Sequence, residues 1–265
     1  MRSAALAALF IGAAALAGAP SALAQQSFAT GQNIAPAYEG WEQNEDGSFN
    51  LVFGYMNRNW EEVIDVPVGP DNGIEPGGPD QGQPTHFLPR RNRFVFRIRV
   101  PADFGDKELI WTLTTNGQTE RAYATLKRDY YIDDLVVQAN YGAAGAAGAT
   151  PESEANEAPA LSVEGQSFRT VAAGEPLTLS IFVDEPDGRP ARWWVGWAKF
   201  SGPGDVRFSQ LEMLADYRYE NRATTTATFS EPGEYVVLVQ SIENIQSFER
   251  QCCWTNGYVE VTVTP

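Results

Sequence analysis

Two adjacent cysteines, Cys252 and Cys253, are the side chains with the most reactive chemistry in this sequence. A bond between them would close a strained small ring, because neighbouring Cα atoms lie about 3.8 Å apart and a relaxed disulfide spans about 4.4–6.8 Å. Two reduced thiols or an intermolecular bridge are the alternatives. Thiolates would also suit Cu(I) or Zn²⁺, although no third ligand is evident. The pair therefore predicts a vicinal disulfide, with free thiols, an intermolecular bridge and a metal or redox site as alternatives.

Tryptophans form a second candidate site. In an extended segment Trp193 and Trp197 share one face, which we expect in the core, and Trp194 points to the other face. Trp194, with Trp254, would then form an exposed aromatic platform, the feature that sugar-binding modules use. A contact between domains would use the same side chains equally well.

Two groups of polar side chains could supply oxygen ligands to Ca²⁺. They are Asp71, Asn72 and Asp80, in a Gly- and Pro-rich loop from Gly69 to Pro84, and Asp184, Glu185 and Asp187. Neither spacing matches a dedicated Ca²⁺ loop, and turn formation explains the same residues. We therefore predict no metal or cofactor, with Ca²⁺ as the one metal that these groups could bind. The loop is long for a sandwich and is expected to be functional or mobile.

Catalytic machinery is sparse. His86 is the single histidine, which leaves one candidate base for a Ser or Cys nucleophile. The sequence has no Gly-x-Ser-x-Gly elbow and no Gly-rich phosphate loop opening a helix. Its many carboxylates include no pair that a motif singles out for glycoside hydrolysis. The chain is predicted not to be an enzyme, with no catalytic residue assigned.

Charge restricts the partners. The formal net charge is −15 and both halves are acidic, which opposes nucleic-acid binding. Arg93, Arg97 and Arg99 alternate with apolar residues and are expected to line one exposed strand face. Ion pairing with acidic residues of the next strand is their predicted role, in preference to anion recognition.

Composition divides the chain into four parts. Residues 1–24 read as a signal peptide, with an apolar run and the small-x-small site Ala22-Leu23-Ala24. The run is too short to span a bilayer, so we expect no membrane insertion after cleavage and a secreted, periplasmic or extracellular protein. Residues 141–158, rich in Gly, Ala and Glu, read as a flexible linker. The expected domains are 25–140 and 159–265.

Alternating apolar residues predict strands in both halves. Phe94, Phe96, Ile98 and Val100 are expected on one face of a strand, and Asn116-Gly117 predicts a hairpin. The strand from Ala223 to Phe229 and the strand starting at Tyr235 are predicted to pair across a Pro-Gly turn. A short helical turn is expected between Leu211 and Tyr219. The predicted fold class is all-β, with two antiparallel sandwiches.

Residues 159–265 resemble the PKD-like or immunoglobulin-like repeats of bacterial extracellular proteins. The resemblance lies in Ala173-Gly174-Glu175-Pro176-Leu177-Thr178-Leu179, Asp187-Gly188, the Trp193–Trp197 strand, Phe229-Ser230-Glu231-Pro232-Gly233-Glu234-Tyr235 and the closing Val259–Val263 strand. It implies a fold and no activity. Residues 36–138 are similar to secreted bacterial proteins without an assigned activity. The adjacent cysteines depart from the widely spaced pair of a true immunoglobulin domain.

The resulting functional prediction is a secreted, non-catalytic interaction or spacer protein of the bacterial cell envelope, whose partner is an envelope protein or a glycan. The alternative is a polysaccharide-binding or polysaccharide-cleaving accessory protein that uses Trp194, Trp254 and the Gly69–Pro84 loop. A weaker alternative is an envelope redox or metal-handling protein that uses Cys252 and Cys253.

Overall fold

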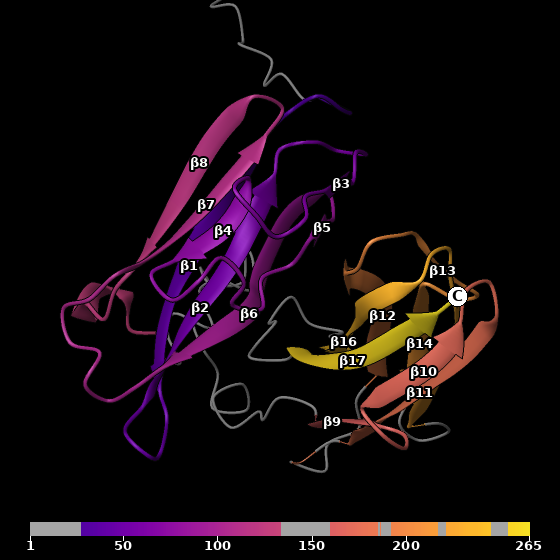
Figure 1. The fold of residues 1–265 in the computed structure, drawn as a ribbon. Helices are drawn as coiled ribbons and strands as arrows, with labels where there is room; N and C mark the ends of the chain where they lie inside the picture. Colours follow the sequence, from indigo (N-terminus) through magenta and orange to yellow (C-terminus); the bar gives the residue numbers. More distant parts are fainter. Residues whose placement is uncertain (1–27, 134–159, 185, 187–191, 217–220, 245–253) are drawn as a thin grey trace, which may run out of the picture.

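The computed structural model describes residues 28–133, 160–184, 186, 192–216, 221–244 and 254–265 (Figure 1). These residues form strands and one short 3₁₀ helix, η1 (Arg128–Tyr130). The all-β prediction is therefore confirmed. The predicted signal peptide, the predicted linker and the pair Cys252 and Cys253 lie outside the described residues. The predicted domain boundaries stay predictions.

The first sandwich contains two three-stranded antiparallel sheets and a two-stranded ribbon. One sheet has the order β1-β2-β6, the other β4-β7-β8, and the ribbon is β3-β5. The bounds are β1 (Ile34–Gln43), β2 (Phe49–Asn57), β3 (Ile64–Asp65), β4 (Asn72–Glu75), β5 (His86–Phe87), β6 (Arg90–Val100), β7 (Leu109–Thr115) and β8 (Gln118–Ala124). Asn116 and Gly117 join β7 to β8 with φ of 49° and 73°, so the predicted hairpin is confirmed.

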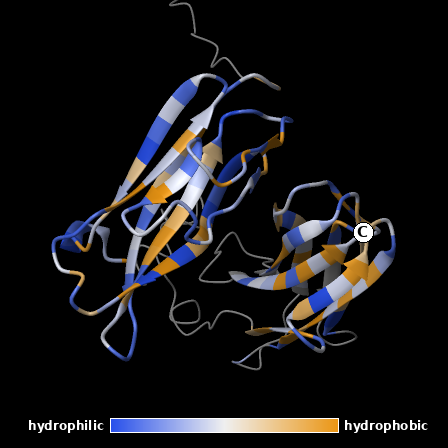
Figure 2. Ribbon diagram, in the orientation of Figure 1, coloured by the Kyte–Doolittle hydropathy of each residue, from blue (hydrophilic) through white to orange (hydrophobic). Residues whose placement is uncertain are grey.

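Aromatic rings fill the core of the first sandwich. Phe53 of β2 stacks on Phe96 of β6 with ring centroids 5.2 Å apart, and Trp111 of β7 meets Phe96 edge-on at 5.1 Å. All three side chains are buried. The alternation of apolar and polar residues that turns these rings inward is visible along the strands in Figure 2. Offset and edge-on rings add favourable contacts beyond the buried area.

Phe94 departs from the prediction because β6 bulges. Phe53 pairs with Phe96 and Tyr55 with Asn92, so Gly54 faces three residues of β6. Phe94 takes a φ of 49° and packs with Val52 and Ile132 in a separate cluster instead of beside Phe96. The bulge reverses the face of the side chain, and this reversal depends on pairing that the local pattern does not encode.

The second sandwich contains the remaining strands in two sheets. Their orders are β9-β11-β15-β13 and β10-β17-β16-β12-β14. The bounds are β9 (Ala160–Val163), β10 (Phe168–Ala172), β11 (Pro176–Asp184), β12 (Arg192–Ser201), β13 (Val206–Phe208), β14 (Glu212–Asp216), β15 (Arg222–Phe229), β16 (Gly233–Asn244) and β17 (Trp254–Thr264). These orders match the A-B-E-D and G-F-C-C′ sheets of an immunoglobulin sandwich, with β10 added in parallel to β17. One departure is that β13, in the D position, precedes β14, in the C′ position.

Two local predictions in this half are wrong. The strands on either side of the Pro-Gly turn do not pair, because β15 and β16 belong to opposite sheets. The turn is instead a corner, where the Tyr235 hydroxyl donates to Glu231 O at 2.8 Å and accepts from Gly204 N at 2.9 Å. The expected helical turn after Leu211 is the edge strand β14, which extends the sheet by pairing with β12. The predicted core positions of Trp193 and Trp197 are confirmed, since both are buried.

Candidate functional site

Direct hydrogen bonds join the two sandwiches. Thr85 N donates to Phe200 O at 3.0 Å, and Thr85 Oγ1 accepts from Gly202 N at 3.3 Å. At the other side, Asn256 Nδ2 donates to Phe94 O at 3.0 Å and Tyr258 Oη to Val95 O at 2.5 Å. The bulged part of β6 thus provides acceptors for side chains of β17.

Apolar contacts strengthen the same junction. Phe200 of β12 and Leu238 of β16, 6 % and 7 % exposed, belong to the core cluster of the first sandwich although they come from the second. Phe200 also meets Tyr258 edge-on, with ring centroids 5.3 Å apart. Burial of such side chains contributes about 1.5–3 kcal/mol each.

A polar cluster of Asp65, His86 and Lys199, here the Asp65 cluster, also joins the two sandwiches. Asp65 Oδ1 is 2.8 Å from His86 Nδ1 and 2.8 Å from Lys199 Nζ. The Lys199 side chain is 4 % exposed and also donates to Gly204 O at 3.0 Å. Burial raises the pKa of Asp65, but hydrogen bonds from His86 and Lys199 outweigh it, so the pKa lies below the ordinary 3.8. The cluster therefore stabilises the carboxylate form.

Acid should weaken the contact between the sandwiches. A carboxylate whose pKa is lowered by folding stabilises the structure above its unfolded pKa, near 3.8, and loses this contribution as the pH falls through the lowered value. We expect the sandwiches to separate at a lower urea concentration at pH 3 than at pH 5. The distance between spin labels on β8 and β13 would report the separation. In Asp65→Asn, the urea concentration that separates the sandwiches should be lower at pH 5 than in the unmodified chain, and it should differ less between pH 3 and pH 5. An equal pH response in Asp65→Asn would contradict this role.

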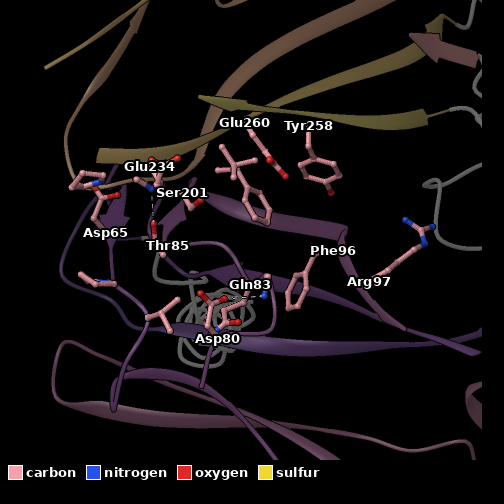
Figure 3. A pocket seen from close by; sticks show the side chains of 17 residues that line it. Asp65, Asp80, Gln83, Thr85, Phe96, Arg97, Ser201, Glu234, Tyr258 and Glu260 are labelled. Carbon is pink, nitrogen blue, oxygen red and sulfur yellow. Dashed lines mark hydrogen bonds between the residues drawn. The ribbon is translucent and has the colours of Figure 1, made fainter. Parts of the chain in front are cut away.

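A cavity of about 900 Å³, here the inter-sandwich groove, opens beside the Asp65 cluster (Figure 3). Phe96 and Arg97 of the first sandwich lie opposite Tyr258 and Glu260 of the second. The lining residues are Asp65, Pro67, Val68, Asp80, Gly82, Gln83, Thr85, Phe96, Arg97, Phe200, Ser201, Gly202, Pro203, Glu234, Val236, Tyr258 and Glu260. Cavities of this size between structural units are common ligand sites.

The charges of the groove are predominantly negative. Arg97 is paired with Glu42, by Nε and Nη2 at 2.9 and 3.0 Å. Asp80, Glu234 and Glu260 are exposed and have no lysine or arginine nitrogen within 4.0 Å among the described residues. Three carboxylates therefore line a partly aromatic cavity, and among the described residues none of them has an ion-pair partner, while the Arg97 guanidinium in the same lining is bound to Glu42.

The Gly69–Pro84 loop is held in shape by amide side chains. Asn72 is fully buried: its Nδ2 donates to Val66 O and Pro84 O, both at 2.9 Å, and its Oδ1 accepts from Trp111 Nε1 at 2.9 Å. Gln83 Nε2 donates to Pro79 O at 2.6 Å. The loop brings Asp80, Gly82 and Gln83 to the wall of the groove.

The candidate Ca²⁺ ligands of this loop are not brought together. Asn72 is fully buried and its Oδ1 accepts from Trp111 Nε1, whereas Asp71 is exposed. Asp80 Oδ1 accepts from Gly82 N at 3.1 Å. Among the residues that the structure describes, no three His, Cys, Asp or Glu side chains are grouped to hold a metal. Of the second candidate group, Glu185 and Asp187 lie outside the described residues.

Trp194 is half-buried and lines a separate hollow of about 430 Å³, here the Trp194 hollow. His86 and Leu88 of the first sandwich close one side of it. The predicted exposed platform is thus recessed against the neighbouring sandwich. The backbone of Trp254 pairs with Ile242, which in turn pairs with Trp194. The Trp254 side chain lies outside the described parts.

The predicted ion pairs of Arg97 and Arg99 in β6 are confirmed, with a different origin for their acids, whereas Arg93 forms no ion pair within 4.0 Å among the described residues. Arg97 pairs with Glu42, Arg91 with Glu39 at 2.6 Å, and Arg99 with Asp46. Glu39 and Glu42 belong to β1, two strands from β6 in the sheet, and Asp46 belongs to the β1–β2 turn. Long guanidinium side chains reach across the intervening strand β2.

The Asp65 cluster and the aromatic lining of the groove were missed from the sequence. Asp65, Lys199 and Tyr258 come from segments far apart in the chain, and no short motif surrounds them. His86 is the single histidine of the sequence, and no local signal indicates its contact with Asp65. Among the described residues, no hydroxyl is hydrogen-bonded to His86.

Comparisons with known proteins give weak likenesses. No family model matches the chain, and no curated protein matches it. Among solved structures, the D00-D0 domain of intimin is 12 % identical with a TM-score of 0.29, covering 87 % of this chain and 100 % of that one. Domains 4 and 5 of the S-layer protein SbsC are 11 % identical with a TM-score of 0.29, covering 60 % and 66 %. CBD12 from CALX1.2 is 11 % identical with a TM-score of 0.26, covering 86 % and 99 %. TM-scores this low establish no common fold, and the sandwich assignment rests on the strand orders of this chain.

The described parts of the chain contain no helix that is long and hydrophobic enough to span a bilayer.

Proposed function

We propose that this chain is a non-catalytic interaction protein acting outside the cytoplasm, and that it holds a basic segment of an envelope partner in the inter-sandwich groove. The observation that carries the proposal is the groove itself, a cavity of about 900 Å³ between two joined sandwiches. The secreted location is supported by the sequence of residues 1–24.

The charge and aromatic content of the groove favour a cationic partner. Asp80, Glu234 and Glu260 attract a lysine or arginine side chain, and the acidic surface of the whole chain increases the rate of encounter. The ring of Tyr258 offers a face for cation–π contact, worth about 0.5–2 kcal/mol. An anionic partner would be repelled by the same carboxylates.

The contacts of the titratable residues favour binding over catalysis. His86 and Asp65 have the composition of a catalytic pair, but the Asp65 carboxylate is shared with the buried Lys199 ammonium. A general base needs a substrate proton or a nucleophile within hydrogen-bond reach. The His86–Asp65 contact instead joins β5 to β3, which is a structural role.

A pair of matched triple variants tests this function. The probe is an acetylated, amidated Lys-Phe-Lys-Phe-Lys peptide, titrated into the full-length mature chain by calorimetry at low and physiological salt. Asp80→Asn/Glu234→Gln/Glu260→Gln should lower the affinity by about tenfold or more. Asp103→Asn/Asp106→Asn/Glu108→Gln removes the same charge from exposed positions of the β6–β7 connection and should leave the affinity nearly unchanged. Equal losses in both variants, or no binding by the unmodified chain, would refute the proposal.

A further inference from the structure

We propose that the Trp194 hollow binds a neutral carbohydrate, by stacking one sugar ring on the indole of Trp194. This site is distinct from the proposed partner groove, because the two cavities share no lining residue. The side chains around the hollow that carry polar groups are His86, Lys199, Asp205, Arg207, Glu212 and Gln240.

The conformation of Trp194 makes it a flat platform. Trp194 and Gly196 share one face of β12, and a Cβ built on Gly196 would lie 2.2 Å from Trp194 Cη2 and 2.7 Å from Cζ2. The six-membered ring of the indole therefore lies directly over Gly196, against the sheet. Any side chain larger than hydrogen at position 196 would lift the ring. One ring face therefore covers the sheet, and Trp194 also lines the hollow.

The polar side chains around this platform are partly fixed by other contacts. His86 Nδ1 lies 2.8 Å from Asp65 Oδ1, which orients the imidazole and leaves Nε2 for a ligand. Gln240 Nε2 donates to Asn256 Oδ1 at 3.1 Å, so Gln240 Oε1 is the atom left to accept a hydroxyl. Orientation before binding reduces the entropy lost when the ligand is held.

The balance of charge selects a neutral ligand. Lys199 and Arg207 contribute two positive groups to the lining, and Asp205 and Glu212 contribute two negative groups. The three carboxylates of the inter-sandwich groove, by contrast, have no ion-pair partner among the described residues. A sugar presents hydroxyls that both donate and accept, together with an apolar ring face that packs on an aromatic ring. The volume of about 430 Å³ lies within the range of about 300–1,000 Å³ found for small-molecule sites.

The test is binding of four neutral tetrasaccharides, of glucose, mannose, galactose and N-acetylglucosamine, to the full-length mature chain. Saturation-transfer NMR and calorimetry measure binding, and an alginate tetramer serves as the anionic comparison. At least one neutral probe should bind, and Trp194→Ala should reduce its affinity by about tenfold or more. Trp194→Phe, which keeps a smaller ring, should lose less.

Two further variants separate stacking from a folding defect. Gly196→Ala keeps the tryptophan but prevents the ring from lying flat, so binding should weaken although the indole remains. Trp60→Ala removes a tryptophan that is 54 % exposed and lies under the Arg90 guanidinium at 4.1 Å, and it should leave sugar binding unchanged. The triple variant of the groove carboxylates should also bind sugar normally. Failure of every neutral probe, preference for alginate, or unchanged affinity in Trp194→Ala would each overturn the proposal.

Discussion

Asn72→Leu is expected to lower the free energy of unfolding of the first sandwich by about 3–5 kcal/mol. Leucine has the same number and branching of side-chain heavy atoms as asparagine, but it is bulkier and makes none of the hydrogen bonds of the amide. The indole N–H of Trp111 and the carbonyl oxygens of Val66 and Pro84 would each lose a buried partner. An unsatisfied buried group costs about 1–3 kcal/mol. Equilibrium urea unfolding followed by tryptophan fluorescence measures the change.

Asp71→Ala is the matched control, one residue earlier in the same loop. Asp71 is exposed, and its backbone oxygen accepts from Thr114 N at 2.8 Å, a contact that alanine keeps. Its effect should stay within about 0.5 kcal/mol. A loss below about 1 kcal/mol in Asn72→Leu would mean that the loop is not held by this amide.

Lys199→Met is expected to weaken the association of the sandwiches by about 1–3 kcal/mol. Methionine retains most of the buried aliphatic stem but removes the ammonium that contacts Asp65 and Gly204 O. Loss of one partner from a buried ion pair costs about 3–5 kcal/mol when the remaining charge is fully buried. The effect here is smaller, because the Asp65 side chain is 49 % exposed and keeps its contact with His86.

Small-angle scattering at increasing urea concentrations would follow the separation of the two sandwiches. In Lys199→Met they should separate at a lower urea concentration than in the unmodified chain. Lys107→Met, at an exposed position before β7, controls for the loss of one positive charge. Identical separation curves for the two variants would contradict the role assigned to Lys199.

Local patterns predicted the elements whose partners are close in sequence. The β7–β8 hairpin needed only Asn116 and Gly117, and the burial of Trp193 and Trp197 followed from the alternation of a single strand. In each case the information that decides the structure is contained within a few residues.

Distant pairing decided the features that were predicted wrongly. Phe94 changes face because Gly54 of β2 meets a bulge in β6. The Pro232-Gly233 turn is compatible with a hairpin or with a crossing between sheets, and only the partners of β15 and β16 choose between them. The same reason hides the Asp65 cluster, whose members join only when the two sandwiches meet. The candidate sites thus depend on tertiary contacts more than on motifs.

Phe200 and Leu238 give the junction a mechanical consequence. A rotation of one sandwich relative to the other would expose both side chains, which are buried in the core cluster of the first sandwich. This exposure would cost about 1.5–3 kcal/mol of free energy for each side chain. The burial of these two side chains therefore favours one fixed arrangement of the two sandwiches. The hydrogen bonds from β17 to β6 act in the same direction, because they tie the last strand of the chain to the first sandwich.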